Sequence, residues 1–277
     1  MSQRVDAGAV SIAVERHGDT DCDLFAAHAN GFCKETLHPL VDAVTARVPG
    51  IRPWLIDLRG HGESDRGEPP YGMPQFGDDV LAVMATTSST PVGLGHSSGG
   101  TAVAIAQLAD PTLFSALVLV EPIFLPPPHE RMDHPLARIA ERRRRSFPSR
   151  DAARERFASG PFFTWTDEAI DAYVDHGFED VDGEWALRCA PEVEADVYRE
   201  GANHDAWDRL GDIDIPVTIV VGERSDTHVG LGLEALIGQF SDPMLEIIPG
   251  AGHFSPMERP DAVAGVVAEV LASADRA

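Results

Sequence analysis

A serine flanked by glycines is the residue of this 277-residue chain with the clearest chemical potential. Residues 95–100 read Gly-His-Ser-Ser-Gly-Gly, which places Ser97 in a GxSxG pattern. A predicted strand, Val92–Gly95, comes before it, and a predicted helix, Gly99–Ala109, comes after it. A serine on such a turn exposes its hydroxyl above the sheet, and the helix start supplies backbone N–H groups that suit an oxyanion. The pattern predicts a nucleophilic serine.

A serine hydroxyl is a poor nucleophile at neutral pH, and the chain offers a base and an acid to activate it. His253 follows the predicted strand Met244–Ile248 in a glycine-rich loop, and Asp226 follows the predicted strand Val217–Val221. His253 is expected to take the proton of Ser97, while Asp226 fixes the imidazole tautomer and stabilises the imidazolium. Glu121, which ends another predicted strand, is the alternative acid, because it could reach the same histidine from a neighbouring loop.

These residues give the chain a resemblance to the α/β-hydrolase fold superfamily. The GxSxG turn and the order serine, acid, histidine carry it, and residues 57–64, Asp-Leu-Arg-Gly-His-Gly-Glu-Ser, match the DxRGxGxS segment of that superfamily. The resemblance covers about Val10–Glu121 and Asp212–Ala272. It implies a mostly parallel sheet flanked by helices, and it favours Asp226 over Glu121 as the acid. It also implies that the DxRGxGxS segment supports the fold rather than the chemistry.

The resemblance further implies an oxyanion hole made of two backbone N–H groups. One belongs to Ser98, the residue after the nucleophile, and the other to the loop after an early strand. This loop reads His-Ala-Asn-Gly-Phe-Cys over residues 28–33, with two more residues before its glycine than the usual His-Gly pattern. The second donor is therefore Gly31, Phe32 or Cys33, and Phe32 is our choice. His28 is expected to order the loop.

The alternation of short apolar runs with segments of helical spacing indicates an α/β fold. The predicted strands are Val10–Glu15, Leu24–His28, Trp54–Asp57, Val92–Gly95, Ala116–Glu121, Val217–Val221 and Met244–Ile248. The predicted helices are Leu37–Val48, Pro74–Thr86, Gly99–Ala109, Leu231–Phe240 and Asp261–Ala272. Residues 1–121 and 211–277 are predicted to form the hydrolase core.

Residues 122–210 differ in composition and are expected to form a helical cap inserted after the strand that ends at Glu121. The expected helices are Ala137–Arg145, Asp151–Ser159, Asp167–His176 and Pro191–Gly201, with no strand between them. Phe162, Trp165 and Trp207 of this segment, with Gly31 and Cys33 of the core, are candidates for lining a substrate pocket. An arginine-rich stretch, 131–156, and an acidic one, 164–200, predict ion pairs within the cap.

Composition narrows the classes of partner. The net charge of −23, with Lys34 as the only lysine, argues against binding to nucleic acid or to a membrane surface. Cys22, Cys33 and Cys189 lack the spacing of a disulfide framework or a metal site, and the chain contains no GxGxxG, Walker A or HExxH motif, so no metal or other cofactor is expected. The first twenty residues lack the apolar core of a secretory signal, which favours a cytoplasmic protein. A homo-oligomer is compatible with the sequence.

The nucleophile also narrows the reaction. Dehalogenases and epoxide hydrolases of the superfamily attack with a carboxylate, and this chain carries a serine. We therefore expect a hydrolase that forms an acyl-enzyme on Ser97 and cleaves a small to medium carboxylic ester or lactone. The same triad also serves carbon–carbon bond hydrolysis and cofactor-free perhydrolysis in the superfamily, and both stay open. A non-catalytic receptor of the same fold is the remaining alternative, although it has no need of a complete triad.

Overall fold

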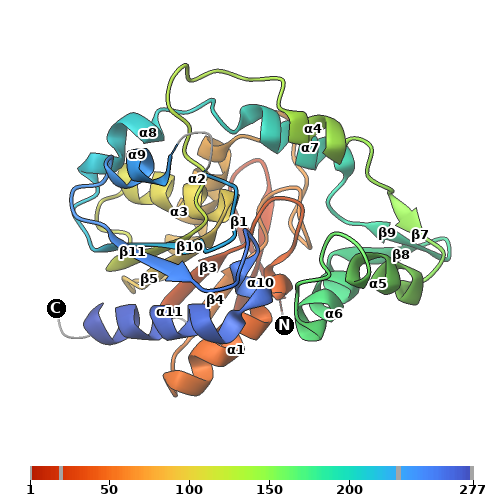
Figure 1. Ribbon diagram of the computed structural model, residues 1–277, viewed down its shortest axis with the longest axis horizontal. Coiled ribbons are helices and arrows are strands. Elements are labelled where there is room, and N and C mark those ends of the chain that lie inside the picture. Colours follow the sequence, from red (N-terminus) through yellow and green to blue (C-terminus); the bar gives the residue numbers. More distant parts are fainter. Residues whose placement is uncertain (1, 19–20, 229–231, 275–277) are drawn as a thin grey trace.

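An eight-stranded sheet forms the centre of the computed structural model, which describes residues 2–18, 21–228 and 232–274 (Figure 1). Its strands are β1 (Ser2–Asp6), β2 (Ser11–Arg16), β3 (Leu24–Ala27), β4 (Pro53–Ile56), β5 (Val92–His96), β6 (Ala116–Val120), β10 (Val217–Gly222) and β11 (Met244–Ile248). They lie in the order β1-β2-β4-β3-β5-β6-β10-β11. β2 runs antiparallel to β1 and β4, and the remaining neighbours are parallel. The predicted mostly parallel sheet is confirmed.

Helices cover both faces of this sheet. α1 (His38–Arg47) and α11 (Pro260–Ala274) lie on one face, and α2 (Met73–Met84) and α3 (Ser98–Ala109) lie on the other (Figure 1). Alternate strand residues serve the two faces, because successive side chains of a strand point in opposite directions. Leu24 packs with α1 and α11, whereas its neighbour Phe25 packs with α2 and α3. Within the described ranges, no helix has both the length and the apolar character that crossing a bilayer requires.

Residues 122–210, which lie within the connection from β6 to β10, will be called the insertion. Its elements are α4 (Pro135–Ala140), β7 (Ser146–Phe147), α5 (Arg150–Ala158), α6 (Asp167–His176), β8 (Phe178–Val181), β9 (Glu184–Leu187), α7 (Pro191–Glu200) and α8 (Ala206–Arg209). The expectation of helices alone was wrong, because β7, β9 and β8 form a small antiparallel sheet. Its hairpin turns at Asp182 and Gly183, whose φ angles of 54° and 86° suit the tight turn that an Asp-Gly pair favours.

Two other predicted helices differ in extent. The expected helix Ala137–Arg145 ends at Ala140 as α4, before the run of arginines. The expected helix Leu231–Phe240 is reduced to α9 (Leu233–Ile237), and its first residue, 231, lies outside the described residues. Short helical turns complete the chain: η1 (Lys34–Leu37), η2 (Leu210–Asp212) and α10 (Ser255–Glu258).

The strand order defines where a site can form. The connection after β3 leads to β4 on one side, whereas the connection after β5 leads to β6 on the other, so the strand order reverses between β3 and β5. Open parallel sheets bind ligands beyond the carboxyl ends of the strands at such a reversal. The loops after β3, β5, β6, β10 and β11 leave the sheet at this end, and they carry all of the residues that the sequence predicts to be catalytic.

Candidate active site

Ser97 occupies a strained turn between β5 and α3. Its φ and ψ angles of 55° and −119° are rare for a residue with a side chain. The turn is also crowded: a Cβ atom built on Gly99 would lie 2.4 Å from the Ala27 carbonyl oxygen of β3. Glycine is therefore required beside the serine, as the GxSxG pattern predicts. Strain of this kind persists only where the surrounding structure enforces it, and it is characteristic of functional sites.

The crowding predicts opposite outcomes for two glycine substitutions. Gly99→Ala is expected to lower the free energy of unfolding by about 1–3 kcal/mol, because the new methyl group must displace backbone. Gly265→Ala, in α11, is the matched control: among the described residues, no atom beyond the adjoining helix backbone lies within 4 Å of the added Cβ, and alanine favours a helix by about 1 kcal/mol over glycine. Urea unfolding measures both. Equal effects of the two changes would contradict the crowding.

His253 is anchored next to this turn by its own backbone. The Nε2–H of His96, the residue before the nucleophile, donates to the His253 carbonyl over 2.8 Å, and the two rings lie 5.3 Å apart. The Glu258 carboxylate accepts the N–H of Gly252 over 2.6 Å and holds the other side of the loop. In the described part of the chain, no hydrogen bond joins the Ser97 hydroxyl to His253. Such catalytic hydrogen bonds frequently tighten only when substrate binds.

The carboxylate nearest to His253 is that of Glu121. Glu121 is fully buried at the end of β6, with a φ of 50°, and its Oε2 lies 3.5 Å from Nδ1 of His253. The Gly222 N–H and the Ser225 hydroxyl each donate to this carboxylate over 2.7 Å. Burial acts to raise the pKa of Glu121, but the interactions with His253, Gly222 and Ser225 outweigh it and leave the pKa below its usual value. Glu121 is thus a buried anion beside the imidazole.

Asp226, the acid favoured by the sequence, is not brought to His253. Its side chain is exposed and makes no hydrogen bond or ion pair in the described part of the chain. The loop after β10 turns so that the residues on either side of Asp226 face inwards: Ser225 reaches Glu121, and the Thr227 Oγ1 lies 2.7 Å from the Nδ1 of His253. The side chain of Asp226, between these two residues, faces solvent. The geometry therefore favours the alternative acid, Glu121.

The sequence predicts two backbone donors for an oxyanion, one at Ser98 and one in the loop after β3. Ser98 is buried and begins α3, where helical N–H groups have no partner within the helix. Of the three candidates after β3, Gly31 already donates its N–H to the Nε2 of His61 over 3.0 Å. The N–H of Phe32 makes only a long contact of 3.4 Å with the Ala29 carbonyl. This geometry disfavours Gly31 and leaves Phe32 and Cys33.

Residues 28–34, which we call the oxyanion loop, are held by buried polar groups. His28 donates from Nδ1 to the Ala29 carbonyl over 2.7 Å and accepts the Leu58 N–H at Nε2 over 3.1 Å. Burial lowers the pKa of His28, which agrees with a neutral ring that orders the loop, as expected. Burial raises the pKa of the Cys33 thiol well above its usual value, which disfavours the thiolate form that a nucleophile needs.

Lys34 is a residue whose role sequence reasoning missed. Its side chain is 1% exposed, and its Nζ lies 2.9 Å from the Asp57 carboxylate and 2.7 Å from that of Glu35. The backbone N–H of Lys34 also donates to Asp57 over 2.8 Å. These contacts fix the end of the oxyanion loop to the DxRGxGxS segment. The sequence feature that could have drawn attention to this position is that Lys34 is the only lysine of the chain.

The predicted pocket residues divide into two groups. Phe162 and Trp165 are buried and pack on Phe32, with ring centroids 5.5 and 5.2 Å from it. Phe254, the residue after His253, lies 5.4 Å from the Trp165 ring. Gly31 and Cys33 lie on either side of Phe32 in the oxyanion loop. Trp207 is not brought to this cluster, because it packs with α2 and α3 in the main core.

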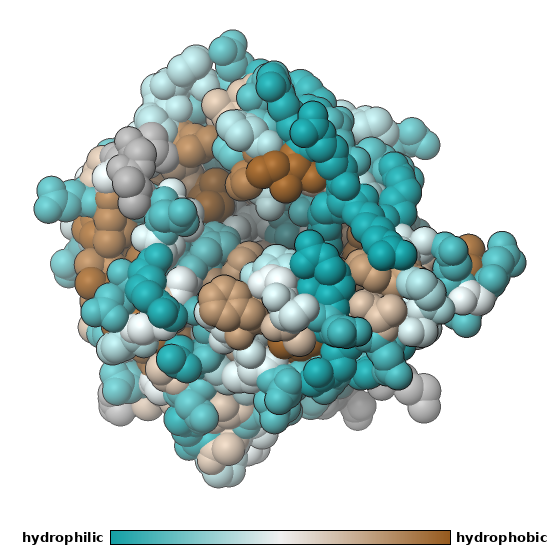
Figure 2. Space-filling model, turned by 45° about the vertical axis from the view of Figure 1, so that its right-hand side comes forward, coloured by the Kyte–Doolittle hydropathy of each residue, from teal (hydrophilic) through white to brown (hydrophobic). Residues whose placement is uncertain are grey.

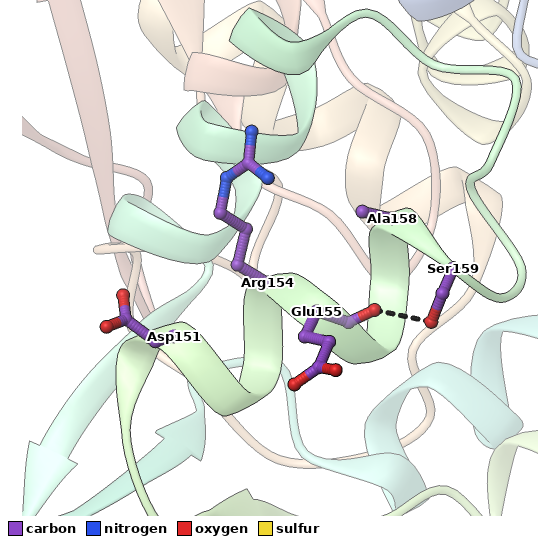
Figure 3. A pocket seen from close by; sticks show the side chains of 5 residues that line it. All are labelled: Asp151, Arg154, Glu155, Ala158 and Ser159. Carbon is purple, nitrogen blue, oxygen red and sulfur yellow. Dashed lines mark hydrogen bonds between the residues drawn. The ribbon is translucent and has the colours of Figure 1, made fainter.

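The face of the molecule shown in Figure 2 is hollowed near its centre, with hydrophilic and hydrophobic residues on the rim. A different depression lies on α5 and is lined by Asp151, Arg154, Glu155, Ala158 and Ser159 (Figure 3). In that depression Arg154 pairs with Asp167 and Asp171, and the Ser159 hydroxyl donates to the Glu155 carbonyl over 2.6 Å. Arg154 and Ser159 are therefore already engaged, and none of the five lining residues contacts the serine or the histidine described above.

Comparison with known proteins identifies the family of this chain. A model of the alpha/beta hydrolase family matches residues 24–266. The chain is 27% identical over 256 residues to 2-(acetamidomethylene)succinate hydrolase of Mesorhizobium japonicum, covering 92% of this chain and 89% of that protein. It is 27% identical over 219 residues to esterase YbfF of Escherichia coli, covering 78% and 81%. The crystal structure of E-2-(acetamidomethylene)succinate hydrolase superimposes with a TM-score of 0.82 at 22% identity, over 97% of this chain and 98% of the other. The chain belongs to the alpha/beta hydrolase family.

Proposed function

We propose that this protein is a serine hydrolase that cleaves a small to medium carboxylic ester or lactone through an acyl-enzyme on Ser97. The observation that carries the proposal is the backbone of Ser97, whose φ of 55° is held in a turn too crowded for any residue but glycine at positions 95 and 99. Such a turn supports a role in which the hydroxyl is presented to a substrate at the end of the sheet.

In the proposed reaction His253 removes the proton of Ser97 as its oxygen attacks the acyl carbon. The imidazolium that forms is stabilised by the buried charge of Glu121, 3.5 Å from its Nδ1. His253 then gives its proton to the alkoxide oxygen as the acyl C–O bond breaks and the acyl group stays on Ser97. An ester releases its alcohol at this step, whereas the hydroxyl of an opened lactone remains part of the acyl group. A water molecule that His253 deprotonates hydrolyses this ester and restores the hydroxyl of Ser97.

The negative oxygen of the tetrahedral intermediate is assigned to the N–H groups of Ser98 and Phe32. Ser98 contributes through the start of α3, and Phe32 through an N–H that has no short partner in the oxyanion loop. Backbone donors that are fixed in advance stabilise this charge without reorganising, and each is typically worth about 3 kcal/mol of the barrier. Residues 122–210 are proposed to act as the cap over this site, since their aromatic side chains pack on Phe32.

An uncharged substrate is favoured by the charges at the oxyanion loop. Arg143, the arginine of the insertion that approaches Gly31, is already paired with Glu194. The excess of acidic residues in the chain adds to this preference. A substituted succinate is the competing substrate class, because the relative in Mesorhizobium japonicum is named as a hydrolase of 2-(acetamidomethylene)succinate.

A substrate panel tests this proposal. Purified protein is incubated with p-nitrophenyl acetate and butyrate, a six-membered lactone, a 1,3-diketone and 2-(acetamidomethylene)succinate, and products are measured directly. Esters or the lactone are expected to give the highest kcat/KM. Preferential cleavage of the diketone would assign carbon–carbon bond hydrolysis instead, and preferential cleavage of the succinate would overturn the uncharged substrate class.

A further inference from the structure

Three polar groups of the insertion converge on the oxyanion loop. The side-chain amide of Asn30 donates to the backbone carbonyl of Glu194, in α7, over 3.0 Å. The Tyr173 hydroxyl, in α6, donates to the Gly31 carbonyl over 3.4 Å. A Cβ atom built on Gly31, whose φ is 83°, would lie 3.0 Å from the Glu194 carboxylate and 3.2 Å from the guanidinium of Arg143. Glycine is needed at this position for its backbone and for this close approach.

Arg143 joins these groups into one unit. Its guanidinium pairs with the Glu194 carboxylate and donates to the Tyr173 hydroxyl over 2.7 Å. Glu194 is 7% exposed, and Tyr173 is fully buried. A buried charge that loses its partner is costly, so the arginine and the glutamate hold each other in place. The insertion thus presents a fixed polar surface to the backbone of Gly31, the residue before the proposed donor Phe32.

The opposite side of the loop is fixed by the core. His61 accepts the Gly31 N–H, and Lys34 is tied to Asp57. The Gly31 carbonyl and the Phe32 N–H, the proposed donor, belong to the same planar peptide group. The direction of that N–H therefore depends on how the Gly31 carbonyl is held. Among the described residues this carbonyl accepts one hydrogen bond, a long one of 3.4 Å from the Tyr173 hydroxyl of the insertion, and Arg143 holds that hydroxyl.

We propose that the Arg143–Glu194 pair is a positioning element that sets the oxyanion donor of Phe32, so that the insertion completes the catalytic site as well as covering it. This inference rests on the proposed serine hydrolase function. Misplacing a catalytic group by about 1 Å can cost on the order of 100-fold in rate. The loss should appear in the transition state, where the oxyanion forms, and only weakly in ground-state binding.

The test compares Glu194→Gln and Arg143→Gln with the matched control Arg131→Gln. Arg131 pairs with Asp196 and Glu200 of the same helix α7, and none of these residues is among the contacts described for the oxyanion loop. Both test variants are expected to lower kcat for p-nitrophenyl butyrate on the order of 100-fold with KM changed less than about threefold. They should weaken inhibition by a trifluoromethyl ketone, whose adduct places an oxyanion in the hole, by a similar factor. Arg131→Gln should change neither. Full kcat and unchanged inhibition in the test variants would overturn the proposal.

A double variant separates positioning from folding. Arg143→Met with Glu194→Leu removes both charges, which buried pairs commonly tolerate without loss of stability. We expect this protein to melt near the wild-type temperature while kcat stays low, because Arg143 no longer holds the Tyr173 hydroxyl that donates to the Gly31 carbonyl. Recovery of kcat in the double variant would show that the pair serves stability alone and would contradict the proposal. A wild-type protein without esterase activity would instead refute the proposed function, so the two failures are distinguishable.

Discussion

Replacing Ser97 with alanine is expected to lower kcat for p-nitrophenyl esters on the order of a million-fold. The substitution removes the oxygen that forms the acyl-enzyme. It keeps Gly95 and Gly99, which the turn between β5 and α3 requires. Alanine is smaller than serine, so the packing around the 8% exposed side chain should be retained. Any residual hydrolysis should reflect stabilisation of the oxyanion by the remaining backbone donors.

The control for Ser97→Ala is the same substitution at a serine outside the proposed site. Ser159→Ala serves this purpose, because Ser159 lies at the end of α5 and donates to the Glu155 carbonyl (Figure 3). It should leave kcat and KM at wild-type values. Initial rates with p-nitrophenyl butyrate, measured on proteins of matched thermal stability, decide the question. A Ser97→Ala protein that retains a tenth of the activity would contradict a covalent mechanism on this residue.

Glu121→Gln is expected to lower kcat about 10³- to 10⁴-fold. The amide keeps the size of the carboxylate and can still accept the N–H of Gly222, but it cannot neutralise the imidazolium of His253. Asp226→Asn should change kcat less than about twofold, because Asp226 is exposed and has no partner in the described part of the chain. Thr227→Val should have an intermediate effect, since a neutral hydroxyl 2.7 Å from Nδ1 can orient the ring without carrying charge.

These variants are compared by kcat across the pH range in which histidine titrates, with Glu223→Gln as a control from the same loop. Glu223 is exposed and accepts the Gly250 N–H over 2.8 Å, away from the imidazole. A large loss for Asp226→Asn together with a small one for Glu121→Gln would show that the loop after β10 rearranges to bring Asp226 to His253. Asp226, the acid that the sequence favours, would then be the partner of His253.

Much of the fold and part of the site could be predicted from the sequence because they depend on local patterns. Buried parallel strands give short apolar runs, and the turn at Ser97 requires glycines at fixed positions on either side. His253 could be placed for the same reason, since it follows the last strand in a glycine-rich loop. Each of these features is set by residues close together in the chain.

The acid could not be ranked from local patterns. Both Glu121 and Asp226 follow strands whose carboxyl ends meet at the same edge of the sheet. What separates them is the direction in which each side chain leaves its loop, and that is set by backbone angles such as the φ of 50° at Glu121. The ion pair of Arg143 with Glu194 joins residues 51 positions apart and depends on how α7 packs. The hairpin of β8 and β9 was foreseeable, because Asp182-Gly183 is a strong turn signal.

Covalent labelling tests directly whether Ser97 is the nucleophile. The folded wild-type protein is treated with a fluorophosphonate, digested, and the modified peptide is sequenced by mass spectrometry. One adduct is expected, on Ser97, that forms in parallel with loss of esterase activity and is absent from Ser97→Ala. A folded protein that hydrolyses esters while Ser97 remains unlabelled, or an inactivating adduct on another residue, would contradict Ser97 as the nucleophile.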